Sequence, residues 1–479
     1  MPFILSNIKR FSFIFKLLFA ILILALILFP AFYNLHFLSI QPWDEALFAL
    51  RAYFLYSEGK VLQHFSEITP MLNYPNSKPV FITLFQALSM KVFGPSEFAL
   101  RLPIALSFVA INFSFLYISK KTFKTYTVGI IAILLFISTK GVNDYHMSRF
   151  GDHDIPFALF FLLFCYQSFQ FMQNKKSINL ILLILFFAIG FLTKSVAMLM
   201  AFPAIFVWII MQGQFKPFIQ DRRILIALIL VFSFLLINYF FQSYHFHNQE
   251  RFTKVLEHQG PFWFYFSKFY NDNLLTPWIY FTPLLLVFLR NNKLLFYFTL
   301  QCLFILLIIS LAQTKLYWYA APFYPLFVFA LSIALFLSYQ WLSNKLPKLK
   351  PFWSISFPLS IILLAYKPYS KHLLEIIQPI DYCNTCRLGY VLRDAKTLQP
   401  HIKQITLLQN EEKTPNFFFY QRVYNQEYGY QIEVAKDFES VKTPYFICSQ
   451  IAYDSLQTKL PLSKVILDYN GAKLIQIEP

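Results

Sequence analysis

The chain has 479 residues, of which 57% are hydrophobic and only 14% are charged, and its formal net charge is +17. An ordinary soluble domain has about 25% charged residues, so this composition excludes a wholly soluble protein and indicates that lipid covers much of the surface. The lysines and arginines stand in short clusters between apolar runs, a pattern that argues against nucleic-acid binding.

Apolar runs of about 15 to 20 residues recur along the chain, which is the length that a helix needs to cross about 30 Å of hydrocarbon. They are apolar on all sides, whereas the strands of a membrane barrel alternate apolar and polar residues. The predicted helical segments are 11–33, 79–93, 102–118, 127–140, 155–172, 178–192, 196–212, 222–241, 277–290, 294–312, 317–342 and 351–366.

The first segment, 11–33, follows Lys9 and Arg10 and has no small-residue cleavage site close behind it. We therefore expect an uncleaved anchor with a cytoplasmic N-terminus, and a removed signal peptide is the weaker alternative.

The basic clusters between the segments decide which of them cross the membrane. If every segment crossed, each cluster would face outward, against the preference of Lys and Arg for the cytoplasmic side. Only 79–93 is short, preceded by proline and interrupted by Gln86 and Lys91, so we expect an interfacial or re-entrant helix there. The outer face then holds 34–101, 144–154 and everything from 367 onward.

Acidic residues gather on this expected outer face. Asp44 and Glu45 follow the first span and open an amphipathic stretch, 46–58, for which simple helix capping is an equally weighted explanation. A second outer loop holds Asp152 and Asp154. A carboxylate near bilayer depth costs about 2.5 to 3.5 kcal/mol unless it is compensated, so several acids at one face indicate function. The Asp-x-Asp spacing suits a divalent cation, although it is common by chance.

Cations accompany these acids on the outer face. Lys78, Lys194 and Lys315 all depart from the charge preference, and snorkelling to the headgroups is the simpler explanation for any one of them. Together with Arg149 and Arg251 they are candidates to neutralise a lipid phosphate.

Histidine and cysteine pairs give weaker indications. His245 and His247 have the spacing of metal ligands, but packing in an aromatic-rich loop is the favoured explanation. Cys383 and Cys386 form a Cys-x-x-Cys outside the membrane, which predicts a structural disulfide or an exposed dithiol. A zinc site is less favoured, because only Cys448 remains in the tail as a further cysteine ligand.

From 367 onward the composition changes, and short β-type runs appear at 404–408, 417–420, 445–447 and 474–477. The expected fold is therefore a polytopic α-helical membrane protein of about 11 to 13 spans in residues 1–366, with a soluble α/β or α+β domain at 367–479.

The outer-face residues fall into short motifs. They are Asp44-Glu45, Lys78-Pro79, Phe93-Gly94-Pro95-Ser96-Glu97-Phe98 before Arg101-Leu102-Pro103, Arg149 with Asp154, Gly190-Phe191-Leu192-Thr193-Lys194, and Lys315 with Tyr319, Pro322 and Pro325. In this order they resemble the membrane glycosyltransferases that use polyprenyl-phosphate-linked sugars, the GT-C superfamily of the protein O-mannosyltransferases and the bacterial lipid A aminoarabinose transferase. Ser195 stands where members often have glycine, and Val80 where they often have a second proline.

The resemblance implies transfer of a hexosyl- or pentosyl-type sugar, with inversion, from a polyprenyl phosphate such as undecaprenyl phosphate. The acceptor would be lipid A, another glycolipid or a protein on the periplasmic face of a bacterial inner membrane. Asp44 would orient or deprotonate the acceptor with Glu45 as support, and Asp154 would be an orienting or metal-binding carboxylate. The expected phosphate ligands are Lys78, Arg149, Lys194, Lys315 and Tyr319. No cofactor is required, since a polyprenyl phosphate is already a fair leaving group, and a divalent metal on Asp152 and Asp154 stays open.

Two other classes of function compete with this one. A transporter or flippase of lipid-linked sugars would have polar residues in mid-span and broken helices in repeated halves, and the sequence shows no internal repeat. A non-catalytic assembly factor would have no need of the outer acids and cations.

Overall fold

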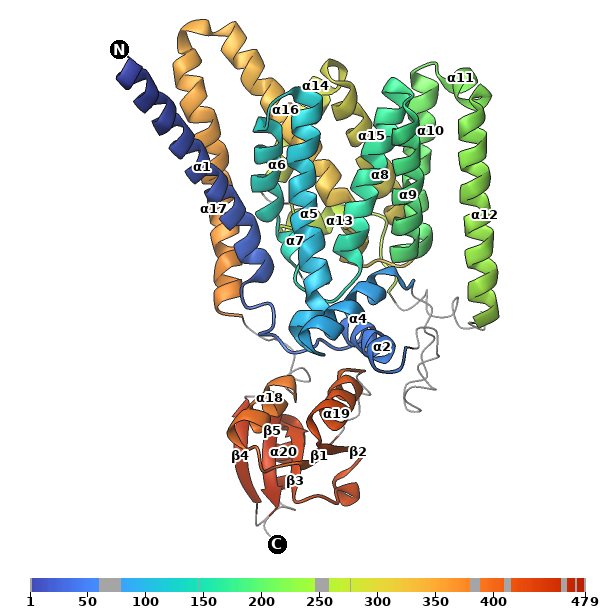
Figure 1. The fold of residues 1–479 in the computed structure, drawn as a ribbon, viewed down its shortest axis with the longest axis vertical. Helices are drawn as coiled ribbons and strands as arrows, with labels where there is room; N and C mark the ends of the chain where they lie inside the picture. The colour runs from blue at the N-terminus through green and yellow to red at the C-terminus, as the bar shows by residue number, and fades with distance from the viewer. Residues whose placement is uncertain are drawn as a thin grey trace.

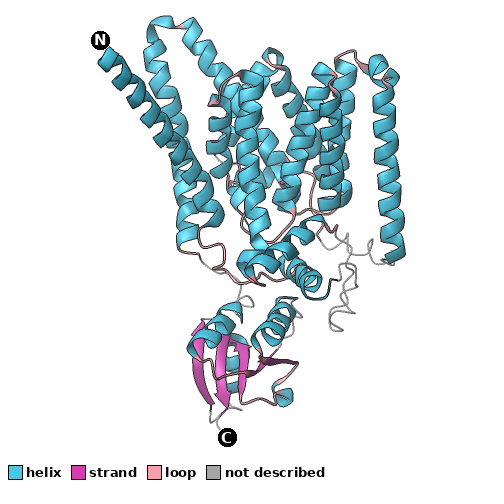
Figure 2. Cartoon of the chain, in the orientation of Figure 1, coloured by secondary structure: helices cyan, strands magenta, loops and turns pink. Residues whose placement is uncertain are grey.

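The structure is a computed structural model that describes residues 2–59, 79–144, 146–245, 258–275, 277–379, 388–408, 415–457, 463–469 and 472–477. Lys78, His247, Arg251, Cys383 and Cys386 lie outside these ranges, as does the side chain of His245. A bundle of long helices is followed by a small C-terminal sheet with its own helices (Figures 1 and 2).

Every helical segment predicted from the apolar runs coincides with a helix. The helices of the first part are α1 (Pro2–Phe32), α2 (Asp44–Glu58), α4 (Phe81–Phe93), α5 (Glu97–Phe123), α6 (Thr127–Ile137), α7 (Lys140–Asn143), α8 (Asp154–Asn174), α9 (Ser177–Lys194), η1 (Ser195–Ala201), α10 (Phe202–Met211), α11 (Phe215–Gln220), α12 (Arg222–His245), α13 (Phe264–Asn271), η4 (Trp278–Phe281), α14 (Thr282–Phe288), η5 (Leu289–Asn291), α15 (Lys293–Leu311), η6 (Tyr317–Ala320), α16 (Phe323–Lys345), η7 (Pro347–Leu349) and α17 (Lys350–Ile377).

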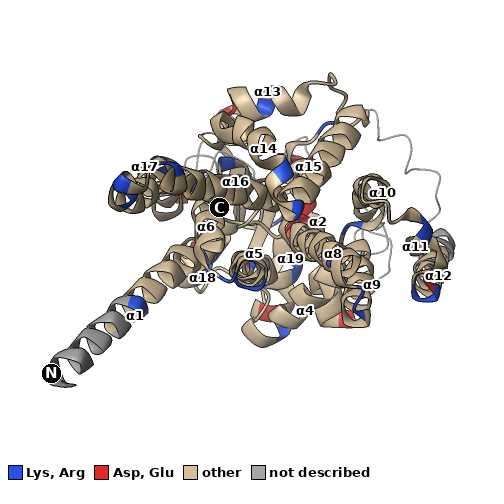
Figure 3. Cartoon of the chain, turned by 90° about the horizontal axis from the view of Figure 1, so that it is seen from above, with Lys and Arg blue, Asp and Glu red and all other residues tan. Residues whose placement is uncertain are grey.

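Within the described residues, six helices are long and apolar enough to cross a membrane, in the ranges Glu97–Phe123, Asp154–Asn174, Ser177–Met211, Lys293–Leu311, Phe323–Lys345 and Pro347–Ile377. The expected class, a helical membrane protein, is confirmed, and the number of spans stays a prediction. The N-terminus and α11 lie at one end of the bundle, whereas α2, α4 and the sheet lie at the other (Figure 1). In the view along the bundle, α1 and α12 stand apart from the central helices (Figure 3).

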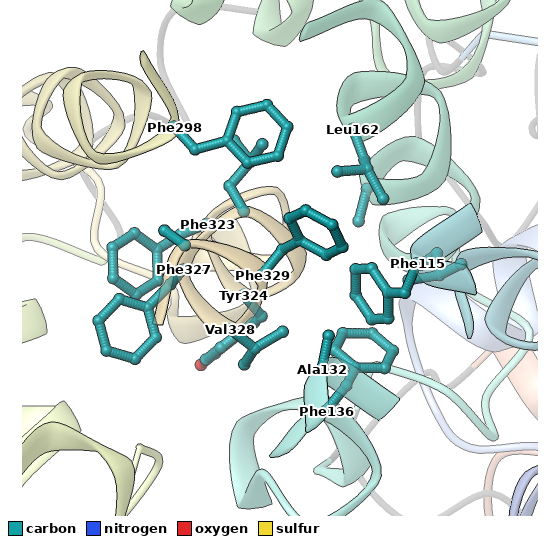
Figure 4. Close-up of a cluster of buried hydrophobic side chains, with 14 of the residues drawn as sticks. Phe115, Ala132, Phe136, Leu162, Phe298, Phe323, Tyr324, Phe327, Val328 and Phe329 are labelled. Atoms are coloured by element: carbon teal, nitrogen blue, oxygen red, sulfur yellow. The ribbon is translucent and has the colours of Figure 1, made fainter. Parts of the chain in front are cut away.

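The bundle packs around α16. Among its buried aromatic side chains, Phe329 stacks on Phe115 at 5.6 Å between ring centroids and meets Phe298 edge to face at 5.9 Å. Phe136 of α6 meets Phe115 edge to face at 5.4 Å (Figure 4). Because aromatic side chains bury large apolar areas, this cluster holds the central helices together and fixes the loops at their ends.

The C-terminal part is a five-stranded sheet with helices. Its elements are α18 (Leu388–Leu398), β1 (Gln404–Leu408), α19 (Pro415–Tyr428), β2 (Gln431–Ala435), η9 (Phe438–Ser440), β3 (Tyr445–Ser449), α20 (Gln450–Leu456), β4 (Ser463–Tyr469) and β5 (Ala472–Ile477). The strand order is β2-β1-β3-β5-β4, with β1 parallel to β2 and β3, and with β5 antiparallel to β3 and β4. The expected small α/β or α+β unit is therefore confirmed.

One predicted strand is wrong: 417–420 belongs to α19. Phe418 and Phe419 are buried, and so are Val423 and Tyr424 one turn later. That spacing is helical, and a four-residue apolar run is too short to distinguish it from a strand.

A second hydrophobic core joins α2 to the C-terminal unit. Ala46, Ala49 and Leu50 of α2 share this core with Phe419 and Val423 of α19. The predicted boundary between 366 and 367 falls inside α17, which continues to Ile377. The division into 1–366 and 367–479 stays a prediction, but the helix that follows the first span packs on the tail.

The two parts approach each other closely at Gly389 of α18. A Cβ atom there would lie 2.5 Å from Cβ of Ser39 and would also overlap the hydroxyl of Tyr420. We therefore predict that Gly389→Ala destabilises the protein by about 1 to 3 kcal/mol, the usual range for overpacking. The check is thermal unfolding in detergent, with Thr397→Ala on the exposed side of α18 as the matched control. Equal stability of both variants would contradict the close packing.

Candidate active site

A buried ion pair fixes the start of α2. Nε of Arg101 donates to Oε1 of Glu45 at 2.7 Å, and Nη2 donates to Oε2 at 2.9 Å. Both side chains are 1% exposed. Arg101 lies in the second turn of α5, so the pair attaches α2 to a long helix of the bundle.

Each partner of this pair binds further backbone. The Nη groups of Arg101 donate to the carbonyls of Leu35, Leu38 and Ser39. Glu45 in turn accepts the N–H of Gln41 at 2.8 Å and the N–H of Gly151 at 2.7 Å. One ion pair therefore joins the end of the first helix, the start of α2 and the loop before α8.

Gly151 is needed at this junction. A Cβ atom on it would lie 2.7 Å from Cδ2 of Leu100 and 3.1 Å from Cγ of Glu45. Its carbonyl accepts from Nε2 of Gln86 in α4 at 2.8 Å. The absence of a side chain thus lets the loop, α2 and α4 meet.

Asp44 stands beside the glutamate but in a different environment. It is half-buried at the first position of α2, and the preceding Trp43 has a positive φ of 67°. Such a conformation is costly for a residue with a side chain and is found mainly where surrounding contacts impose it. The ligand atoms of Asp44, His146 and Asp152 all lie within 4.8 Å of one another.

His146 and Asp152 form a buried pair next to Asp44. Nδ1 of His146 and Oδ2 of Asp152 are 2.9 Å apart, and the imidazole lies against Trp318, with 4.0 Å between ring centroids. Burial raises the pKa of Asp152 to about 6 against the opposing effect of His146. Burial alone would lower the pKa of His146, but Asp152 and the other nearby acids raise it above its ordinary value.

A second pair involves Asp154, two positions after Asp152 in the chain. Asp154, the first residue of α8, forms an ion pair with Lys194, the last residue of α9. The ammonium also lies 5.3 Å from the ring centroid of Tyr319. The structure thus brings together three residues that the sequence singled out from three separate motifs.

Two other predicted phosphate ligands have backbone partners. Arg149 donates to the carbonyls of Pro30 and Tyr33 at the end of α1. Nζ of Lys315 donates to the carbonyls of Ile309, Ser310 and Ala312, and so caps the C-terminus of α15. In this structure both cations complete backbone hydrogen bonding, and their role as phosphate ligands stays a prediction.

The C-terminal unit reaches the same region. The hydroxyl of Tyr420 accepts the N–H of Ile40 at 2.8 Å and donates to Glu97 of α5 at 2.8 Å. Arg393 donates to the carbonyls of His36 and Phe37. The segment that leads into Asp44 is therefore held from one side by Arg101 and from the other by the tail.

Sequence reasoning missed two residues of the site. Arg101 was noted only within a motif, because nothing in the sequence pairs it with a glutamate 56 residues away. His146 was not singled out, although it stands between Asp144 and Asp152 in the loop. A shallow pocket lies beside this histidine and is lined by Gly141, Asp144, Met147, Leu274, Tyr317, Trp318 and Tyr324.

Acids and cations thus gather at one end of a helical membrane bundle, and the chain is similar in sequence and in fold to membrane transferases that use lipid-phosphate-linked sugars. The profile of the family described as dolichyl-phosphate-mannose-protein mannosyltransferase matches residues 77–240. The crystal structure of ArnT from Cupriavidus metallidurans bound to undecaprenyl phosphate superposes with a TM-score of 0.66. It shares 13% sequence identity and covers 96% of this chain and 98% of that one. The apo form of the same protein gives a TM-score of 0.67.

Curated relatives agree with this fold. The undecaprenyl phosphate-alpha-4-amino-4-deoxy-L-arabinose arabinosyl transferase of Wigglesworthia glossinidia brevipalpis is 27% identical over 65% of this chain. The match spans 58% of that relative, which is less than two thirds of its length. An uncharacterized protein of Aquifex aeolicus (strain VF5) is 24% identical over 74% of this chain and 72% of its own length. The resemblance to the polyprenyl-phosphate-sugar-dependent superfamily is confirmed.

The ion pair of Arg101 gives the first test of this site. We predict that Arg101→Lys lowers stability by about 1 to 3 kcal/mol, because a lysine keeps the charge but cannot make the two parallel hydrogen bonds to Glu45 or reach all the carbonyls that the guanidinium binds. Arg223→Lys, in a pair with Asp221 whose arginine is 43% exposed, is the matched control and should change little. Unfolding in detergent measures both, and equal losses would contradict the central role of the buried pair.

Proposed function

We propose that the chain transfers a sugar from a polyprenyl-phosphate carrier to an acceptor at the membrane surface. The observation that carries the proposal is the convergence of Asp44, the His146–Asp152 pair and the Asp154–Lys194 pair at one end of the bundle. The fold supports it, because a protein of the same fold has been solved with undecaprenyl phosphate bound. Lipid-phosphate chemistry needs acids and cations together where the helices end.

Asp44 and Glu45 take different roles in this proposal. Glu45 accepts hydrogen bonds from Arg101, Gln41 and Gly151, so it positions its neighbour and does not react. Asp44 is half-buried at the helix start, where it can orient or deprotonate an acceptor hydroxyl. The acidic pair thus combines a structural carboxylate and a reactive one.

Asp154, Lys194 and Tyr319 form the phosphate side of the proposed site. Lys194 is 23% exposed and lies between the carboxylate of Asp154 and the ring of Tyr319. When the donor's phosphate approaches, its charge competes with Asp154 for the same ammonium. Asp154 then holds the lysine in place before the donor binds. Lys78, Arg149 and Lys315 stay predicted ligands, the first of them outside the described residues.

The proposal also covers the acceptor, the orientation in the membrane and the transferred sugar. We place the acceptor, which is lipid A, another glycolipid or a protein, on the outer face of the inner membrane. The N-terminus is then cytoplasmic and the sheet periplasmic, since the sheet lies at the end of the bundle that carries the acids (Figure 1). The transferred group is a hexosyl- or pentosyl-type sugar.

The same acids offer a site for a divalent cation. An imidazole and two carboxylates whose ligand atoms lie within 4.8 Å of one another suit a borderline or hard metal ion. Asp152 would belong to this set together with Asp44 and His146, whereas Asp154, the other predicted ligand, is paired with Lys194. A bound cation would supply positive charge close to the donor phosphate.

Metal analysis of the purified protein tests this arrangement. We predict about one bound divalent ion per chain by mass spectrometry of the dissolved protein, and its loss in both Asp152→Asn and His146→Ala. Asp154→Asn should keep the ion. A metal content that is unaffected by either of the first two changes would exclude these three residues as its ligands.

The catalytic assignment has its own test. With radiolabelled polyprenyl-phosphate sugar and native membranes, Asp44→Asn should reduce label transfer by at least a hundredfold, because the acceptor loses its base. The matched control is Asp221→Asn, at the other end of the bundle, which should transfer label at the normal rate. The unfolding temperature of both variants should equal that of the wild type.

Two results would contradict the proposal. Normal transfer by Asp44→Asn would remove Asp44 from the chemistry. Movement of intact donor across the membrane by reconstituted protein, without transfer to any acceptor, would indicate a flippase instead.

A further inference from the structure

Arg51 is a buried cation on the same face of α2 as Asp44. Positions 44, 48 and 51 have the spacing that places side chains on one side of a helix. Phe48 stacks on His153 with 3.8 Å between ring centroids, so this face of α2 meets the loop of Asp152. The opposite face carries Ala46 and the other residues of the core shared with the tail.

The guanidinium of Arg51 lacks the partners that its burial demands. It is 1% exposed, and Nη1 donates to the carbonyl of Pro79 at 3.2 Å. Within the part of the chain that the structure describes, Nε and Nη2 have no hydrogen-bond partner and no acidic side chain forms an ion pair with Arg51. Burial lowers the pKa of Arg51 to about 9, which reflects a cation without a compensating anion.

The contrast with Arg101 shows which atoms are missing a partner. Arg101 uses the edge formed by Nε and Nη2 to grip both oxygens of Glu45. In Arg51 the same two atoms are the unsatisfied ones. This edge of a guanidinium matches two oxygens of one carboxylate or one phosphate, which it binds through two parallel hydrogen bonds.

The energetics favour an anion at this edge. A buried unpaired charge costs several kcal/mol, and an apolar residue would avoid that cost in a helix already packed on both sides. The other cations near the site are engaged, Arg149 and Lys315 with carbonyls and Lys194 with Asp154. Among these four cations, within the described residues, Arg51 is therefore the one that keeps buried donors, Nε and Nη2, without a hydrogen-bond partner.

We propose that Arg51 binds the phosphoryl group of the lipid-linked donor through Nε and Nη2. This inference rests on the proposed function and adds a binding residue to it. Asp44 and Arg51 are seven positions apart, a rise of about 10 Å along the helix, and Phe48, stacked on His153, lies between them on the same face. One face of α2 then carries Asp44, which acts on the acceptor, at its start, and Arg51, which binds the donor phosphate, two turns later.

The test uses the opposite effects that Arg51→Met should have on stability without lipid and on the affinity for lipid. Wild-type protein and Arg51→Met are purified in detergent, and thermal unfolding is followed with and without undecaprenyl phosphate. Ligand bound only to the folded state raises the unfolding temperature of the wild type. Arg51→Met should unfold at the same or a higher temperature without lipid, because it removes an unpaired charge, and should bind undecaprenyl phosphate at least tenfold more weakly.

Further arms separate the sources of phosphate. Phosphatidylglycerol and inorganic phosphate are titrated in the same way, and each should give less than a tenth of the affinity of undecaprenyl phosphate. Arg51→Lys keeps the charge but lacks the two parallel N–H donors of the guanidinium. Its affinity for undecaprenyl phosphate should lie between those of the wild type and Arg51→Met. The matched control is Arg422→Met in α19. The guanidinium of Arg422 lies 4.6 Å from the ring centroid of Phe54, on the side of α2 that faces the tail. This substitution should leave the affinity for undecaprenyl phosphate unchanged.

Two results would overturn the proposal: unchanged affinity of Arg51→Met for undecaprenyl phosphate, whatever its lipid-free stability, or equal binding of phosphatidylglycerol by the wild type. Different outcomes distinguish failure of this proposal from failure of the proposed function. Unchanged binding by Arg51→Met together with loss of transfer in Asp44→Asn would reject Arg51 alone. Arg51-dependent binding without transfer to any acceptor would reject the transferase and keep the anion site.

Discussion

The ion pair between Glu45 and Arg101 is the interaction on which the rest of the site depends. Because the pair is buried, water cannot solvate either charge if the partners separate. Each partner also binds backbone groups of other segments. Buried pairs contribute little net stability compared with apolar packing, but they specify one arrangement, since a displaced partner leaves a bare charge. Here that arrangement sets where α2 begins, and Asp44 is its first residue.

The C-terminal unit takes part in the same arrangement. It buries one face of α2, and Tyr420 and Arg393 bind the segment that precedes it. The opposite face, with Asp44 and Arg51, is left toward the bundle. The tail therefore packs on one side of α2 and holds the segment before Asp44 in place, which preorganises the side chains on the other face of the helix.

Much of this was predictable from the sequence because lipid imposes strong patterns. Apolar runs located the helices. The acids and cations between them were predicted to share one face, and the structure brings two of them, Asp154 and Lys194, into contact. Other contacts of these residues could not be read from the sequence. The partner of Arg101 and the carbonyls bound by Arg149 and Lys315 are distant in sequence or are backbone atoms, and neither leaves a signal in residue types. At 417–420, a run of four residues left helix and strand indistinguishable.

The core shared by α2 and the tail also affects the order in which contacts can form during synthesis. The hydrogen bond between Ile40 and Tyr420 joins residues 380 positions apart. At about 5 to 20 residues per second of synthesis, roughly 20 to 75 s separate the two on the ribosome. Arg101 follows Glu45 by 56 positions, within roughly 3 to 11 s at the same rate. During biogenesis the Glu45–Arg101 pair can therefore form long before the tail is made. The apolar face of α2 stays without its partner in the tail until the end of synthesis.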